Sequence, residues 1–158
     1  MKIDVHVRVV KSSAIYGLRT AVLRPHFPQG KLAIFEGDED DTTRHYAAYI
    51  GTGDEPVGCA TLMQRDCPIY VSSGEVTAMF QLRGMAVSGE HRRKGIGQRV
   101  IASIEQDLSQ VRHAVLLWFN ARKSAVAFYE SAGYAMLGEE FDVPGIGPHY
   151  VMCKVIEG

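Results

Sequence analysis

Apolar residues follow two spacings along this chain, one typical of strands and one typical of helices. Residues 3–9 alternate apolar and polar side chains, which predicts a strand. Ser12 and Ser13 then precede a helical pattern, so we expect the two serines to cap a helix that runs to about Leu23 and ends before Pro25. The chain is therefore expected to begin with a strand followed by a helix.

Three strand-like segments follow. Residues 45–50 and 57–64 are short apolar runs, and the turn-forming residues 51–56 between them suit a hairpin. Residues 76–87 predict a longer third strand. The polar segment 36–44, with its run of acidic residues, is expected to be an exposed loop.

The clearest helix in the pattern begins near two glycines at positions 95 and 97. Its apolar residues recur at steps of three and four, which places them on one side of a helix. They are Ile96, Val100, Ile101, Ile104, Leu108 and Val111. The continuous apolar run 114–119 that follows fits a strand buried on both faces, in the middle of a sheet.

The last third of the sequence predicts one helix and two strands. The helix is expected over 122–132 and should stop at Gly133, and the strands are expected at 134–137 and 149–155, around a Gly/Pro loop at 143–148. This order predicts an α/β protein with a mixed sheet and helices on its faces. No linker divides the chain, so we expect a single domain over residues 1–158.

Composition narrows the class of protein further. The chain has 158 residues, with 17 Lys and Arg against 18 Asp and Glu, and this net charge of -1 argues against a nucleic-acid binder. Its three cysteines are odd in number and lack zinc-site spacing, which argues for reduced thiols and no metal. No segment is typical of a signal peptide or a membrane span, so we expect a cytoplasmic protein without a membrane partner.

A basic segment between the third strand and the clearest helix carries the strongest chemical signal. Two glycines let the backbone turn tightly, and the N–H groups of the first helical turn favour an anion. The segment is Arg92, Arg93, Lys94, Gly95, Ile96, Gly97 and Gln98. It lacks the Gly-Lys-Ser/Thr ending of a Walker loop and the third small residue of a dinucleotide fingerprint, so another diphosphate ligand is predicted.

The segment from Arg92 to Gly97 resembles the pyrophosphate loop of the GNAT superfamily of acyl-CoA N-acyltransferases, whose pattern is Arg/Gln-x-x-Gly-x-Gly/Ala. Asn120 and residues 128–130 match the next motif of that family, and the order of elements agrees along nearly the whole chain. Further segments, such as 141–149, are similar to a small bacterial branch without an assigned substrate. The resemblance implies a mostly antiparallel mixed sheet of six or seven strands with helices on both faces.

The same resemblance implies acetyl-CoA as co-substrate. The backbone of Met85, Ala86 and Val87 would pair with the pantetheine arm, and the Val87 N–H could polarise the thioester carbonyl. The Asn120 amide would hydrogen-bond the pantetheine, although an asparagine there could instead be a helix N-cap. Tyr129 would be the general acid that protonates the departing thiolate.

The general base stays open at this point. Many relatives carry a Glu on the strand before the loop, where this chain has Gln81 and Arg83. Deprotonation through water is one alternative, and Glu75, His45 and His149 are candidates by residue type alone.

The acceptor pocket is expected to draw on five residues: Arg24, His45, Gln81, Arg83 and His149. Arg19 joins Arg24 and Arg83 as an arginine that needs an anionic partner if it is buried, either a carboxylate of the protein or one on the acceptor. The expected reaction is acetyl transfer to a primary amine of a small molecule, by direct attack in a ternary complex. A protein lysine or N-terminal amine is an alternative acceptor, a non-catalytic acyl-CoA sensor is an alternative class, and a homodimer is possible.

Overall fold

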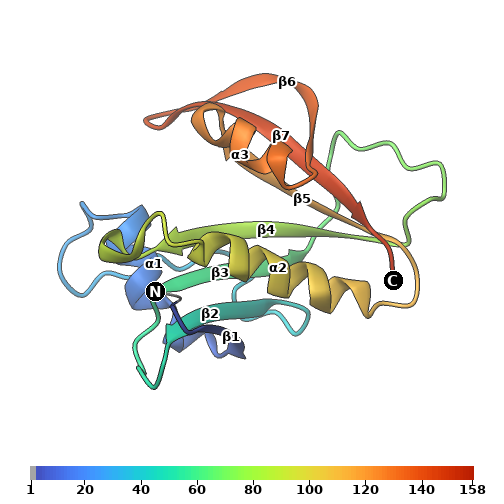
Figure 1. The fold of residues 1–158 in the computed structure, drawn as a ribbon. Coiled ribbons are helices and arrows are strands. Elements are labelled where there is room, and N and C mark those ends of the chain that lie inside the picture. The colour runs from blue at the N-terminus through green and yellow to red at the C-terminus, as the bar shows by residue number, and fades with distance from the viewer. Residues whose placement is uncertain (1–2) are drawn as a thin grey trace. The chain divides into compact units, whose positions relative to one another are not determined.

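A computed structural model describes residues 3–158, and the chain forms two compact units (Figure 1). The first unit extends to Met63 and resumes over Leu82–Asp107, and the second comprises Gln64–Gln81 and Leu108–Gly158. Seven strands are hydrogen-bonded in the order β1-β2-β3-β4-β5-β7-β6. Strand β4 contributes its second half to the first unit and its first half to the second.

The first unit contains three strands of its own, the second half of β4, and helices α1 and α2. Strands β1, β2 and β3 are antiparallel neighbours. The bounds are β1 Val5–Val10, η1 Ser12–Ala14, α1 Tyr16–Leu23, β2 Arg44–Ile50, β3 Gly58–Gln64, β4 Ala78–Val87, η2 Gly89–His91 and α2 Ile96–Ser109.

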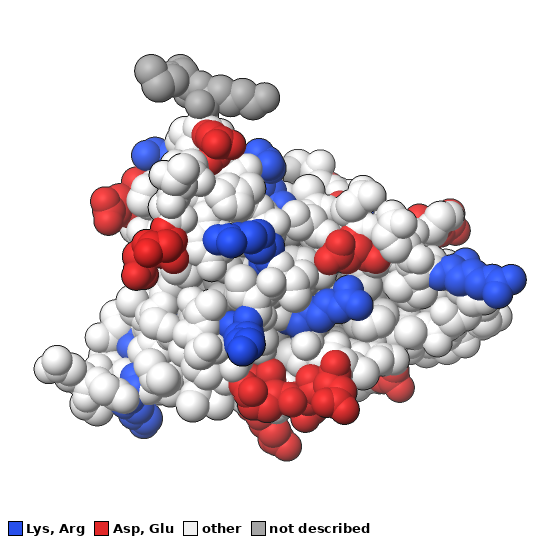
Figure 2. Space-filling view, turned by 90° about the horizontal axis from the view of Figure 1, so that it is seen from below, with Lys and Arg blue, Asp and Glu red and all other residues white. Residues whose placement is uncertain are grey.

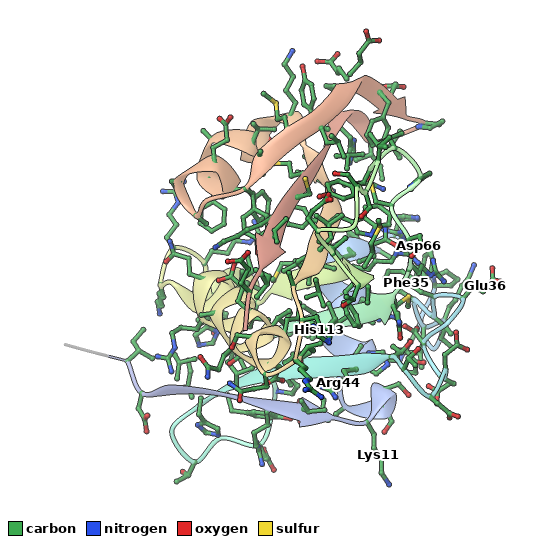
Figure 3. The ribbon with its side chains drawn as sticks, turned by 90° about the vertical axis from the view of Figure 1, so that its right-hand side faces the viewer. Lys11, Phe35, Glu36, Arg44, Asp66 and His113 are labelled. Atoms are coloured by element: carbon green, nitrogen blue, oxygen red, sulfur yellow. The ribbon has the colours of Figure 1, made fainter. Side chains whose placement is uncertain are left out.

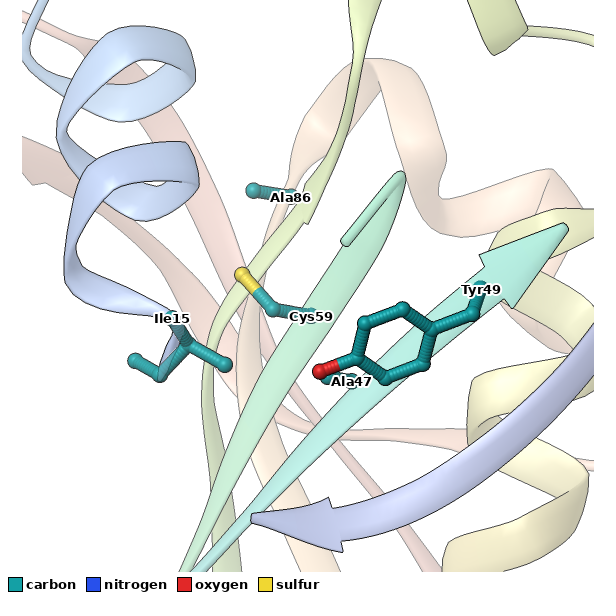
Figure 4. Packing of buried hydrophobic residues seen from close by; sticks show 5 residues of the cluster. All are labelled: Ile15, Ala47, Tyr49, Cys59 and Ala86. Carbon is teal, nitrogen blue, oxygen red and sulfur yellow. The ribbon is translucent and has the colours of Figure 1, made fainter. Parts of the chain in front are cut away.

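Helices cover both faces of the sheet in this first unit. Ile15, at the start of α1, packs against Ala47 on β2 and Cys59 on β3, with Tyr49 and Ala86 in the same buried cluster (Figure 4). The Tyr46 side chain points to the opposite face of the sheet from that of Ala47, because successive residues of a strand point to opposite faces. Its hydroxyl donates a hydrogen bond of 2.7 Å to Asp107 of α2. Helices α1 and α2 therefore lie on opposite faces, as the sequence predicts.

The second unit consists of strands β5, β6 and β7, the first half of β4, and helix α3. Residues 78–81 of β4 run parallel to β5, and β7 lies antiparallel between β5 and β6. The bounds are β5 Val115–Arg122, η3 Lys123–Ala125, α3 Val126–Ser131, β6 Ala135–Val143 and β7 Gly147–Ile156.

The two faces of this second sheet are covered by different elements. Helix α3 lies beside β5 and β7 (Figure 1), where the ring of Tyr129 packs 4.5 Å from that of Phe119. Trp118 points to the other face and forms a buried cluster with Cys67, from the segment before β4. The Trp118 indole N–H donates to the Arg65 carbonyl at 2.9 Å, which fastens that segment to the sheet.

Three expectations from the sequence were wrong in detail. Strand β5 continues past the apolar run to Arg122, which pairs with His149, so the helix begins later than expected. Strand β6 continues to Val143 through an irregularity in its register after Leu137. Ser12 does not cap a helix, since its hydroxyl donates to the Glu39 carboxylate instead.

Candidate functional site

The basic loop between β4 and α2 has an unusual backbone. Arg93 has a φ of 63°, and it is the only non-glycine with positive φ among residues 3–158. Gly95 has a φ of 76° and accepts the first helical hydrogen bond of α2, from the Arg99 N–H at 3.1 Å. Left-handed backbone is costly for a side-chain-bearing residue and tends to occur at functional loops. The Arg92, Arg93 and Lys94 side chains are all exposed around this turn.

The first turn of α2 offers backbone N–H groups that the helix itself does not use. Helix geometry leaves the first N–H groups without partners inside the helix, here those of Ile96, Gly97 and Gln98. A Cβ added at Gly97 would come no closer than 3.9 Å to the nearest atom, on Val87. Packing inside the protein thus does not require a glycine at position 97. Such free donors at a helix N-terminus can bind an anion.

The end of β4 carries backbone groups that are not used by its two neighbours. The pairing of β4 with β5 covers Ala78 to Gln81 only. On the other side, the Ser88 N–H donates to the Val57 carbonyl at 2.9 Å, which directs residue 88 toward β3. Because backbone direction alternates along a strand, the N–H and C=O groups of Val87 and Met85 face away from β3. A chain-like ligand could hydrogen-bond to them as an added strand does.

Arg19 is the largest fully buried side chain among residues 3–158, with an exposed fraction of 0%. Its guanidinium donates to both carboxylate oxygens of Asp38, at 2.7 and 3.0 Å, and to Thr61 Oγ1 at 2.6 Å. The acidic loop expected to be wholly exposed therefore supplies a buried carboxylate, because Arg19 on α1 needs an anion at this place. Sequence analysis did not identify the buried Asp38, since nothing in the acidic segment distinguishes it from Glu39 or Asp40.

His45 belongs to the same buried network. Its Nε2 lies 2.8 Å from the Asp38 carbonyl oxygen and its Nδ1 lies 2.8 Å from Thr61 Oγ1. A carbonyl oxygen can only accept, so Nε2 carries the hydrogen and Nδ1 accepts from the Thr61 hydroxyl. Both ring nitrogens of this predicted acceptor residue are thus bonded inside the protein.

Arg83 and Arg24 differ in their surroundings. The Arg83 guanidinium lies 4.5 Å from the centre of the Phe35 ring, and the Arg19 guanidinium lies 3.9 Å from that centre. Phe35 itself is on the loop between α1 and β2 (Figure 3). The half-buried Arg24 donates to the carbonyl of Leu23 at 2.9 Å. Phe35 thus links Arg83 on β4 to the buried network around Arg19.

In the second unit, Tyr129 is half-buried and packs in an aromatic cluster with Phe119, Phe128 and Tyr134. Burial raises the pKa of the Tyr129 phenol above its ordinary value. The phenol therefore carries its proton at neutral pH, as a proton donor must.

Four polar residues project from the opposite face of the same sheet. Opposed residues in a strand pair share a face, and alternate residues of one strand do so too. Trp118 pairs with Gln81, and Arg122 pairs with His149, so these residues and Asn120 all lie on the Trp118 face. Asn120 is thus placed with two predicted acceptor residues, whereas Tyr129 is on the Phe119 face. Arg122 is a further candidate that alternation from Asn120 could have identified.

Glu75 has little capacity as a base. Its carboxylate accepts hydrogen bonds from the Tyr70 hydroxyl and from the N–H and hydroxyl of Ser73. These bonds, led by that from Tyr70, lower the pKa of Glu75 to about 2. A carboxylate of such low basicity takes up a proton poorly at neutral pH.

Each unit contains a cavity of a size that fits a small ligand. In the first unit a cavity of about 450 Å³ is bordered by Lys11, Ser12, Glu39 and His45, among others. In the second, a cavity of about 410 Å³ is lined by Arg122, Lys123, Ser124, Ile146 and Pro148. Small-molecule sites commonly have volumes of about 300 to 1,000 Å³.

Charges of both signs are distributed over the surface, and basic and acidic side chains occur together on the face seen in Figure 2. Within residues 3–158, no three His, Cys, Asp or Glu side chains gather so that they could hold a metal ion. No helix in this part of the chain has both the length and the apolar composition needed to cross a membrane.

Residues 36–154 match the family described as acetyltransferase (GNAT) domain. The chain therefore belongs to the GNAT family and is an acyltransferase. The resemblance inferred from the pyrophosphate loop and the α/β fold class are both confirmed.

Similar proteins agree with this assignment. The "Uncharacterized N-acetyltransferase YitI" of Bacillus subtilis (strain 168) is 28% identical over 150 residues, which cover 95% of this chain and 95% of that protein. Crystal structures with the same fold include Escherichia coli ElaA, with a TM-score of 0.68, 22% identity and coverage of 96% and 99% of the two chains. Arabidopsis thaliana NAA60 in complex with acetyl-CoA has a TM-score of 0.69 at 16% identity, with coverage of 98% and 99%.

Proposed function

We propose that this protein transfers an acetyl group from acetyl-CoA to the primary amine of a small molecule, by direct attack within a ternary complex. The chain acts as a single GNAT domain, since the family match extends over segments of both compact units. The amine nitrogen attacks the thioester carbon, the C–S bond breaks, and the products are an amide and free coenzyme A.

The open first turn of α2 is the observation that carries the choice of acetyl-CoA. The diphosphate would accept hydrogen bonds from the first-turn N–H groups, beside Arg92, Arg93 and Lys94. A Cβ at position 97 would contact only Val87, at an ordinary 3.9 Å, so the protein itself does not require a glycine there, and we propose that the close approach of the diphosphate does. The pantetheine arm would continue along the outward-facing backbone of Met85 and Val87, and the Val87 N–H would stabilise the negative charge that develops on the thioester oxygen.

Tyr129 is proposed as the general acid. As the C–S bond breaks, the sulfur takes on negative charge and needs a proton to leave readily. The half-buried phenol would supply that proton, since its raised pKa leaves it protonated at neutral pH.

A small acceptor is favoured by the cavity beside Arg122, whose volume of about 410 Å³ suits a metabolite-sized molecule. Gln81, Asn120 and His149, on the face that Arg122 shares, offer polar groups to such an acceptor. Arg24, Arg83 and His45 remain proposed acceptor residues, and His45 would act through its network with Thr61 and Asp38.

A panel of amines, with release of the coenzyme A thiol as the readout, tests this function. The proposal expects steady thiol release with at least one small amine and little release with peptides that present a lysine or a free N-terminus. Faster release with peptides would favour the protein-acetylating alternative. Acetyl-CoA binding without thiol release from any amine would favour the sensor alternative.

A further inference from the structure

We propose that His149 is the general base, which removes the proton from the acceptor ammonium before attack. This inference rests on the function proposed above and names a residue for a role that no other observation assigns.

The hydrogen bond made by His149 defines its tautomer. Its Nδ1 lies 2.8 Å from the carbonyl oxygen of Gly147. Since that oxygen can only accept, Nδ1 is the donor, and in the neutral ring the lone pair is on Nε2. This Nε2 has no hydrogen-bond partner within residues 3–158. The backbone thus orients the ring and leaves one basic nitrogen unused.

The surroundings of the ring fit a role in the site. His149 has an exposed fraction of only 7%, and its ring lies 5.8 Å from that of Phe141 on β6. Among the described residues the only fully enclosed side-chain nitrogen or oxygen without a partner is Arg19 Nε, so Nε2 of His149 is not sealed off and a bound molecule can reach it. A ligand or a bound water would satisfy Nε2. The directly opposed Arg122 lines the cavity of about 410 Å³, as does Pro148, the residue before His149.

The other candidates are less suited to take this proton. Both nitrogens of His45 are engaged by Thr61 and by the Asp38 carbonyl. Glu75 is held in its charged form by the hydrogen bonds that lower its pKa to about 2.

The proton balance of the step is complete. Nε2 takes one proton from the ammonium, which gives the neutral amine its lone pair for attack. The tetrahedral intermediate collapses with loss of the thiolate, which receives a proton from Tyr129. The Tyr129 phenolate then takes up the proton that the nitrogen loses as the amide forms. The imidazolium returns its proton to water.

His149→Asn is the informative variant, because the Asn side-chain N–H can replace the Nδ1 donor to Gly147 while the basic Nε2 is lost. The probe is acetyl-CoA with the best amine of the panel. We expect kcat to fall about 10² to 10⁴-fold, with acetyl-CoA affinity and melting temperature unchanged. With an alkoxyamine acceptor, which is already neutral at pH 7, kcat should fall far less in the variant, because no base is needed.

Each result that would contradict the proposal has a different meaning. If the variant keeps kcat within about twofold, His149 is not the base although the acetyltransferase assignment stands. An equal loss with ammonium and alkoxyamine acceptors would also overturn the proposal, since it would indicate a structural role. A wild-type protein that turns over no amine overturns both the function and the base. Nitrogen-15 spectra of the wild-type ring should show the hydrogen on Nδ1, and a hydrogen on Nε2 alone would contradict the proposal without any turnover assay.

Discussion

The Arg19 guanidinium donates hydrogen bonds to both carboxylate oxygens of Asp38 inside the first unit, at 2.7 and 3.0 Å. Both side chains are shielded from water, with exposed fractions of 0% and 1%. The pair joins α1 to the loop before β2, and the Thr61 contact extends it to β3. Asp38 is therefore the buried anchor of this acidic segment, while the more exposed Glu39 accepts hydrogen bonds from Ser12 and Tyr16.

Removing one member of this pair should destabilise the protein strongly. Arg19→Met leaves the Asp38 charge buried without its partner, a change that typically costs about 3 to 5 kcal/mol. Urea unfolding measures the loss. In a double-mutant cycle, Arg19→Met combined with Asp38→Asn should cost clearly less than the sum of the single changes. Additive losses would contradict a direct interaction.

The stability of the fold should depend on pH through Asp38. Burial alone would raise the pKa of Asp38, but hydrogen bonds from Arg19 and from the Phe35 N–H hold it below the ordinary value. A lowered pKa adds stability above about pH 4, the unfolded value, which is lost as the pH falls further. As the pH falls below about 4, the unfolding free energy should therefore fall less steeply in Asp38→Asn than in the wild type. If the unfolding free energies of the two proteins fell equally with pH, other carboxylates would account for the loss of stability in acid.

Gly84 on β4 should not tolerate a side chain. Its φ is 61°, and an added Cβ would lie 3.0 Å from Phe35 Cε2 and 3.1 Å from Arg19 Nε. Gly84→Ala should lower the unfolding free energy by about 1 to 3 kcal/mol. Gly17→Ala is the matched control, because Gly17 is in α1 with nothing within 4 Å, and it should be neutral or stabilising. Equal effects of the two changes would contradict a special need for glycine at position 84.

Tyr129→Phe should separate catalysis from binding. The ring still packs against Phe119, but the proton for the leaving thiolate is lost. Turnover should drop about 10²-fold or more, while the acetyl-CoA dissociation constant stays within about twofold. Unchanged turnover would leave Tyr129 with a packing role only.

The sequence predicts most of the elements because their apolar periodicity is strong, as in α2. Strand ends were less predictable, because the extension of β5 to Arg122 depends on its backbone pairing with β7 and not on apolar side chains. Asp38 was missed for a similar reason. Its partner is 19 residues away in the sequence, and only the fold distinguishes it from its acidic neighbours.

The candidate site was likewise only partly predictable from the sequence. The pyrophosphate loop is a local feature, so its residues could be identified from the sequence. The tautomer of His149 depends on the hairpin that brings the Gly147 carbonyl to Nδ1, and no spacing rule indicates it. The shared face of Gln81, Asn120 and His149 likewise follows from the strand register.

The most direct test of the central claim is the affinity for acetyl-CoA of variants at Gly97, measured by calorimetry. Gly97→Ala should keep or raise the melting temperature, since the helix gains a better helix former and its Cβ would make only an ordinary contact with Val87, at 3.9 Å. Its acetyl-CoA affinity should nevertheless fall, and Gly97→Asp should abolish binding by filling the diphosphate space with a negative charge. Wild-type affinity in a folded Gly97→Asp protein would contradict the proposed coenzyme site.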